Sequence, residues 1–225
     1  DLPHTPAKEL GPPQAYEAAA TLYRSWLKAG IVTTRPPAMF AYRQTIKDSF
    51  GAKTQRSGMA CTVDAVPFGP RPGGGILPHE ETFSGPKEDR LALMKATRAQ
   101  LSPIFGLFAD DSGRATSLLH KVMAARKPDV TATTADGVHH EVWTISDAPT
   151  IKSYQDALAG QDIFIADGHH RYNTALNYIK HLESQGTVPA AARRCMMVLV
   201  GMSDPGLIIW PTHRILGGMK SYSID

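Results

Sequence analysis

The stretch IFIADGHHRY, residues 163–172, decides the fold and carries the most informative chemistry in the chain. Its first four residues are apolar and predict a short buried strand over Ile163–Ala166. Apolar side chains then recur at helical spacing, at Tyr172, Ala175, Leu176, Ile179 and Leu182. The segment therefore predicts a buried strand that turns directly into an amphipathic helix near Tyr172.

The turn between this strand and helix suits an anion, and a phosphate group above all. A helix start leaves about four backbone N–H groups without partners, and its dipole favours a negative charge. Gly168 lets the backbone approach a ligand closely, and Arg171 offers a planar fork of donors. His169 and His170 add donors or acid–base capacity. The alternative, that these side chains only cap and pack, explains a single histidine better than two adjacent ones.

The rest of the chain alternates between the two kinds of element. Helices are expected over Gln14–Ala29, Pro86–Gln100, Ala115–Ala125 and around Ser153–Leu158. Strands are expected over Met39–Ile46, Met59–Val66, Ile104–Phe108, Val130–Thr134, Val138–Ile145, Met196–Val200 and Leu207–Trp210, the first two as a hairpin. Leu91, Met94 and Leu101 are expected to face the core. This interleaving predicts an α/β or α+β fold, with an irregular lead-in over 1–13 and one domain over 14–225.

Composition narrows the classes of function. The 225 residues are 42% hydrophobic and 20% charged, which is ordinary for a globular protein. A net charge of +3 is too small for a typical nucleic-acid binder, so DNA is not an expected partner. No stretch approaches the ~20 apolar residues of a membrane span. Cys61 and Cys195 form no framework of disulfides or CxxC pairs, which favours a reducing, cytoplasmic location.

Two further segments are candidates for chemistry. His79-Glu80-Glu81-Thr82 follows a Gly-rich loop and offers a general base or a metal ligand; the alternative is a solvated acidic turn ahead of a helix. Pro211-Thr212-His213-Arg214 follows the apolar run 207–210, where α/β proteins gather ligand contacts; the alternative is a plain strand exit.

The string ADGHHRY, residues 166–172, resembles the hallmark of the family known as domain of unknown function 1015. Five shorter strings agree in order and spacing: HEET (79–82), PKEDR (86–90), SPIF (102–105), VWTI (142–145) and PTHR (211–214). The similarity runs over nearly the whole chain. It resembles the middle part of a family member, so we expect a fragment of a longer protein.

The resemblance implies a ParB/sulfiredoxin-like fold, a mixed sheet with flanking helices that binds nucleotides or phosphate. Members share a strand–turn–helix with a G-x-x-R core, here residues 168–171, and the free-serine kinases carry a similar DGHHR. By that resemblance Gly168, His169, His170 and Arg171 hold nucleotide phosphates. Asp167 orients them or approaches a metal, and the expected cofactor is Mg²⁺ with ATP or ADP.

Other relatives with this fold fit the chain less well. Sulfiredoxin carries its reactive cysteine where this chain has His169, so sulfinic-acid reduction is not supported. ParB proteins carry G-E-R-R and an adjoining DNA-binding domain; here His169 and His170 replace the Glu and the first Arg, and no helix-turn-helix pattern follows them in this sequence, so DNA segregation is not expected. The kinase interpretation remains, and it needs a catalytic carboxylate, for which Glu80 beside His79 is the candidate.

Three hypotheses result. The first is a nucleotide-dependent phosphotransferase or hydrolase acting on a small polar metabolite, with His213 and Arg214 as further phosphate contacts. The second is a non-catalytic nucleotide- or anion-sensing module on the same fold. The third is a metal-dependent hydrolase, for which the Zn²⁺-type ligands are His79, Glu80, His169, His170 and His213. Their spacing matches no HExxH-type motif.

Overall fold

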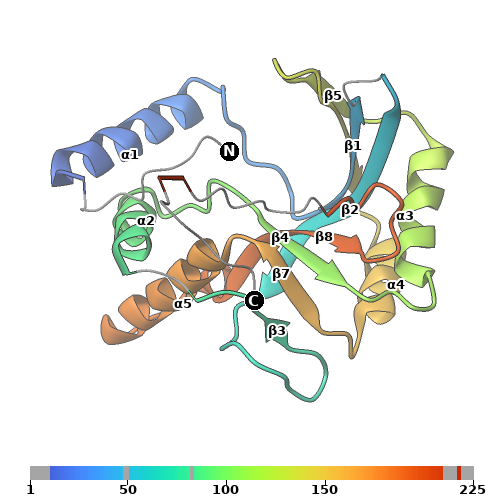
Figure 1. Ribbon diagram of the computed structural model, residues 1–225. Coiled ribbons are helices and arrows are strands. Elements are labelled where there is room, and N and C mark those ends of the chain that lie inside the picture. The colour runs from blue at the N-terminus through green and yellow to red at the C-terminus, as the bar shows by residue number, and fades with distance from the viewer. Residues whose placement is uncertain (1–10, 48–50, 82–83, 210–216, 219–225) are drawn as a thin grey trace.

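The computed structural model describes residues 11–47, 51–81, 84–209 and 217–218, and helices alternate with strands along most of the chain (Figure 1). The helices are α1 (Pro13–Lys28), α2 (Ser84–Thr97), α3 (Arg114–Ala125), α4 (Ala148–Leu158) and α5 (His169–Ser184), with a 3-10 turn at Ala190–Arg193. The strands are β1 (Met39–Lys47), β2 (Lys53–Asp64), β3 (Ile76–Leu77), β4 (Ile104–Phe108), β5 (Val130–Thr133), β6 (His139–Ile145), β7 (Ile163–Asp167) and β8 (Arg194–Gly201).

These strands form a mixed sheet of order β3-β7-β4-β8-β2-β1-β6-β5. The pairs β3–β7 and β4–β8 are parallel, and the other neighbours are antiparallel. Because β4 runs opposite to β7, the ends of β3 and β7 and the start of β4 all lie at one edge of the sheet. The turn from β7 into α5 lies at this edge.

Helices cover both faces of the sheet. Figure 1 shows α3 and α4 on one side, and α1, α2 and α5 on the other. α3 contacts β1, β2 and β8, whereas α5 contacts β4 and β8. α2 packs on α5, and α1 packs on α2. The largest fully buried core side chains include Trp143, Tyr154, Tyr172, Phe108 and Leu119. The expected mixed α/β class is therefore confirmed.

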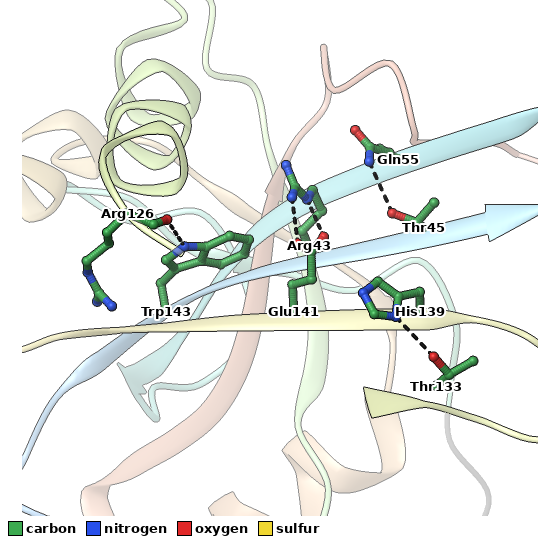
Figure 2. Close-up of polar contacts among 8 residues, drawn as sticks. All are labelled: Arg43, Thr45, Gln55, Arg126, Thr133, His139, Glu141 and Trp143. Atoms are coloured by element: carbon green, nitrogen blue, oxygen red, sulfur yellow. Dashed lines mark hydrogen bonds and ion pairs between the residues drawn. The ribbon is translucent and has the colours of Figure 1, made fainter. Parts of the chain in front are cut away.

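Cross-strand side-chain pairs fix the register of β1 on the α3 side of the sheet, as Figure 2 shows. Arg43 donates two hydrogen bonds of 2.7 Å to the Glu141 carboxylate on β6. Its guanidinium carbon lies 5.1 Å from the centre of the Trp143 ring, a cation–π contact. Because side chains alternate along a strand, this places the neighbours Tyr42 and Gln44 on the opposite face.

Most predicted elements are present. β4 has the predicted bounds, Ile104–Phe108, and the β1–β2 hairpin is confirmed, although β2 begins at Lys53, earlier than Met59. Within the described ranges, no helix combines the length and apolar character needed to cross a lipid bilayer. Cys61 and Cys195 are buried on β2 and β8, and burial raises the pKa of each thiol to about 12. Both thiols therefore stay protonated at neutral pH and are poor nucleophiles.

The strand predicted over Leu207–Trp210 is wrong for the part that the structure describes. Residues 207–209 have no regular secondary structure, and Ile209 is 84% exposed. The buried carboxylate of Asp204 accepts a hydrogen bond of 3.1 Å from the backbone N–H of Ser57. This contact ties the turn after β8 to β2, and the chain does not add a further strand there. Trp210 itself lies outside the described residues.

The second predicted helix is shorter than expected. α2 ends at Thr97, because Arg98 adopts a left-handed backbone conformation with φ of 55°. Leu101 therefore lies beyond the helix and is 56% exposed, so its predicted core position is wrong. Strand β3 is not predicted from the sequence, because its two residues are too few to give a pattern of their own.

Tyr172 anchors α5 to the chain that leaves β2. Its buried hydroxyl donates to Val66 O at 2.6 Å and accepts from Val66 N–H at 2.9 Å. Its ring packs on Phe68 with a centroid distance of 4.9 Å. The first turns of α5 are thus held by one side chain that satisfies two backbone groups.

Replacing Tyr172 with Phe is expected to lower the free energy of unfolding by about 1–3 kcal/mol, because both Val66 backbone groups lose their partner in a partly buried position. Urea unfolding followed by circular dichroism measures this change. The matched control is Tyr178→Phe on the same helix, which should stay within about 0.5 kcal/mol of the wild type. Equal unfolding midpoints for Tyr172→Phe and the wild type would contradict the anchoring role.

Candidate functional site

The sheet topology brings three sequence motifs to one edge. β3 and β7 are parallel and paired, with Leu77 opposite Phe164, so the segments that follow them emerge side by side (Figure 1). His79-Glu80 follows β3, and 167–171 follows β7. The antiparallel strand β4 starts at the same edge, preceded by Ser102-Pro103. We call the residues 167–171, at the end of β7 and the first turn of α5, the elbow.

Gly168 is the N-cap of α5 and has a left-handed backbone with φ of 103°. A Cβ atom at this position would lie 3.0 Å from Arg171 Nε and 3.1 Å from its guanidinium carbon. Two independent constraints, backbone conformation and close approach, therefore favour glycine here. The helix starts at His169, earlier than predicted, so the guanidinium of Arg171 packs back against the first turn of its own helix.

Arg171 is held by three acceptors. Its NH1 donates to Ser102 Oγ at 2.8 Å and to Pro103 O, and its NH2 donates to Asp167 Oδ2. The Asp167 side chain is 69% exposed, so this ion pair lies at the surface. Arg171 and Arg90 also line a small hollow of about 80 Å³ beside α5. The elbow thus combines a helix N-terminus with a fixed guanidinium, the arrangement that binds phosphate in many proteins.

His79, Glu80 and His169 form a second cluster beside the elbow. His169 is almost completely buried, and its Nδ1 lies 3.1 Å from Glu80 Oε1. Its Nε2 accepts a hydrogen bond of 3.2 Å from the backbone N–H of His79. The two imidazole rings meet edge to face, with a centroid distance of 4.5 Å. His79 Nδ1 lies 2.8 Å from Ile165 O, so the cluster is tied to β7.

These contacts fix the tautomers of both rings. A carbonyl oxygen only accepts, so His79 carries its proton on Nδ1 and presents Nε2 as an acceptor. His169 accepts at Nε2, so its neutral form carries the proton on Nδ1 and donates it to Glu80. Glu80 is 50% exposed, so its carboxylate is held by the buried His169 and is still accessible to a ligand from solvent.

The same tautomer argument bears on metal binding. Ligand atoms of His79, Glu80 and His169 lie within 4.8 Å of one another, close enough to surround a cation. Coordination through His169 Nδ1 would place the ring proton on Nε2, where it would face the N–H of His79. Two donors would then oppose each other in a buried position, which is costly. Of the three residues, His79 Nε2 and the Glu80 carboxylate are the groups that the described contacts leave open to a cation.

Burial controls the charge of the histidines. Desolvation lowers the pKa of His169, and the neighbouring Glu80 carboxylate only partly opposes this shift. Desolvation also lowers the pKa of His170, where Lys87 and Arg90 add to the shift and Glu80 opposes it. Both imidazoles are therefore neutral at pH 7.

The structure brings most of the predicted site residues together. The described members are Glu80, His79, Asp167, Gly168, His169, His170 and Arg171, at the same sheet edge. His213 and Arg214 lie outside the described residues. For His169 the group that suits an anion is the backbone N–H at the helix start, because both ring nitrogens are engaged within the chain.

Residue-by-residue reading missed the partners of Arg171. Ser102 and Pro103 belong to the string SPIF, but nothing in their chemistry alone points to a site. Their role follows from the antiparallel pairing of β4 with β7, which is a tertiary feature. A covarying pair between positions 102 and 171 is the signal that could have found them.

Fold and elbow together define a mixed α/β protein in which a strand–helix turn at a sheet edge holds an arginine beside a helix N-terminus. The chain belongs to the family described as "Protein of unknown function (DUF1015)", whose profile matches residues 1–225. A comparison with curated proteins gives no match, and a comparison with solved structures gives none either. The family resemblance is thus confirmed, and the ParB/sulfiredoxin-like fold stays a prediction.

The lowered pKa of His169 predicts a specific dependence of stability on pH. An unfolded histidine takes up a proton near pH 6.5, whereas the folded His169 resists protonation, so the unfolded state binds more protons as the pH falls. The free energy of unfolding should therefore decrease from about pH 7 toward about pH 5. His169→Gln should reduce this slope, and His120→Gln, at an exposed position on α3, should not.

Urea unfolding at several pH values measures the slopes, and nitrogen NMR of the histidine side chains reads the tautomers directly. We expect His169 as the Nδ1–H form at pH 7. A charged imidazolium, or the Nε2–H form, would contradict the hydrogen bonds that hold Glu80.

Proposed function

We propose that the elbow binds the phosphate groups of a nucleotide, and that the protein transfers a phosphoryl group from ATP or ADP to a small polar metabolite. One observation carries the proposal: the guanidinium of Arg171 is packed against Gly168 at the start of α5. An anion at this position would be attracted both by the fixed guanidinium and by the positive end of the helix dipole.

Electrostatics around the elbow support an anionic ligand. The positive charges of Arg90 and Lys87 on α2 help to lower the pKa of His170, and Arg90 lines the same small hollow as Arg171. Asp167 neutralises part of this charge through its ion pair with Arg171. A phosphate group would compete with that carboxylate for the guanidinium.

Glu80 is the proposed base. Phosphoryl transfer asks a protein mainly to position groups and to neutralise charge, and a carboxylate then accepts the proton of the attacking hydroxyl. The Nδ1–H of His169 would hold Glu80 in place for this step. The exposed carboxylate of Asp167 also suits Mg²⁺, which prefers oxygen ligands and binds through one or two carboxylates plus phosphates. Bound Mg²⁺ would neutralise phosphate charge.

The competing interpretations make different demands on the same residues. A non-catalytic sensing module needs the elbow but not Glu80. A Zn²⁺ hydrolase that uses the cluster of His79, Glu80 and His169 needs His169 as a ligand, and the tautomer of His169 opposes this. The phosphotransferase is the interpretation that uses both the elbow and the oriented carboxylate.

Removing the guanidinium tests phosphate binding. Titration of the full chain with ATP and Mg²⁺ in a calorimeter should show binding, and Arg171→Ala should weaken it by about tenfold or more, since a charge-assisted hydrogen bond contributes about 1.5–3 kcal/mol. The matched control is Arg193→Ala, which removes an exposed arginine that pairs with Glu183 instead. No binding of ATP, ADP or CTP to the wild type would overturn the proposal.

The same preparation separates transfer from sensing. Glu80→Gln should keep nucleotide affinity within about twofold and abolish turnover of a phosphoryl acceptor. Wild-type binding without turnover of any acceptor would instead favour the sensing module.

Replacing Gly168 should reduce ATP affinity about as much as replacing Arg171. Gly168→Ala forces a Cβ into the space beside the guanidinium and strains a left-handed backbone, so we expect a loss of ATP affinity similar to that of Arg171→Ala. Gly160→Ala is the control, because φ at Gly160 is 81° and its added Cβ would meet no atom within 4 Å. That variant should lose stability but keep ATP affinity. Equal affinities for both alanine variants would contradict the close-approach argument.

A further inference from the structure

A groove of about 300 Å³ crosses the face of the sheet on the side away from α3. Five strands line it, and the lining includes Tyr42 and Gln44 on β1, Arg56 on β2, Phe105 on β4, Asp167 on β7 and Val200 on β8. Gly58 forms part of the floor: a Cβ there would lie 2.8 Å from Val200 Cγ2, so glycine keeps the floor at backbone level. The volume is at the lower end of the range for ligand pockets and suits a small metabolite better than a nucleotide.

Arg56 is the cation of this groove. Its guanidinium carbon lies 4.8 Å from the centre of the Phe105 ring, and its NH2 donates to Gln44 Oε1. Tyr42, two residues before Gln44 on β1, also lines the groove, and its hydroxyl lies 2.6 Å from His140 Nδ1. The Phe105 ring and the Gln44 amide therefore hold the arginine in position through neutral partners.

The contrast with Arg43 on the neighbouring strand is informative. Arg43 lies on the opposite face of the sheet and is neutralised by two hydrogen bonds to Glu141 (Figure 2). Arg56 makes no ion pair with any carboxylate of the described residues. A half-buried guanidinium whose protein partners are neutral attracts an anion of fitting size.

The groove shares a wall with the elbow. Asp167 and Pro103 line the groove, and both accept hydrogen bonds from Arg171. Phe105, whose ring lies beneath Arg56, pairs with Asp167 across β4 and β7, so the backbones of these two residues are about one strand spacing apart. A short molecule bound at Arg56 would thus extend toward the elbow.

We propose that this groove binds the carboxylate group of a small organic acid through Arg56, and that the other end of this acid faces the elbow as the phosphoryl acceptor. The acceptor role rests on the proposed function of the elbow. Binding of the carboxylate does not depend on it, because Arg56 makes no contact with Arg171 among the described residues.

Calorimetric titrations of the full chain with lactate, succinate and citrate test the site, with inorganic phosphate and ATP–Mg²⁺ as separate arms. We expect at least one carboxylate to bind the wild type. Arg56→Gln should weaken that binding by about tenfold or more, and Arg56→Lys, which keeps the charge but loses the fork, should weaken it less. Arg114→Gln, an equal change of charge at an exposed position on α3, is the control and should match the wild type.

Each arm decides a different point. Failure of every carboxylate to bind, binding of inorganic phosphate in place of carboxylates, or unchanged carboxylate affinity in a folded Arg56→Gln would overturn the groove proposal. Carboxylate binding that depends on Arg56 supports it, even where ATP fails to bind and the proposed function of the elbow is refuted. Thermal unfolding of both Arg56 variants establishes that they are folded, and Arg56→Lys keeps the test decisive if Arg56→Gln is not.

Discussion

The contact between Arg171 and Gly168 is the constraint on which the site depends. The guanidinium lies against the backbone where any other residue would carry a Cβ, and this fixes both the left-handed turn and the direction of the arginine. Ser102 and Pro103, which directly precede β4, supply its other two acceptors. A flexible cation is thereby converted into a fixed one beside the positive end of a helix, so little conformational entropy is lost when an anion binds.

The second constraint is the parallel pairing of β3 with β7. It is short, but it sets His79 and Glu80 beside the elbow, and the carbonyl of Ile165 selects the tautomer of His79. The backbone N–H of His79 then selects the tautomer of His169, which donates to Glu80. A chain of hydrogen bonds thus links a buried strand to an exposed carboxylate, and each step depends on the one before it.

Much of this could be predicted from the sequence. The IFIADGHHRY stretch gives its strand and helix because apolar periodicity is local, and the elbow follows from the residue types within it. The expected strand at Leu207 fails because an apolar run does not reveal whether a sheet neighbour is present. In the structure the Asp204 carboxylate accepts from the backbone N–H of Ser57, and the chain turns away after β8. The groove at Arg56 was not predictable either, since five separate segments line it. That Arg56 contacts neutral groups and no carboxylate is visible only once those segments are folded together.

A crystal structure with a non-hydrolysable ATP analogue and Mg²⁺ is the decisive measurement of phosphate binding at the elbow. We expect phosphate oxygens within hydrogen-bond distance of the Arg171 guanidinium and of the backbone N–H groups at the start of α5. An analogue bound elsewhere, with Arg171 still held only by Ser102, Pro103 and Asp167, would contradict this expectation.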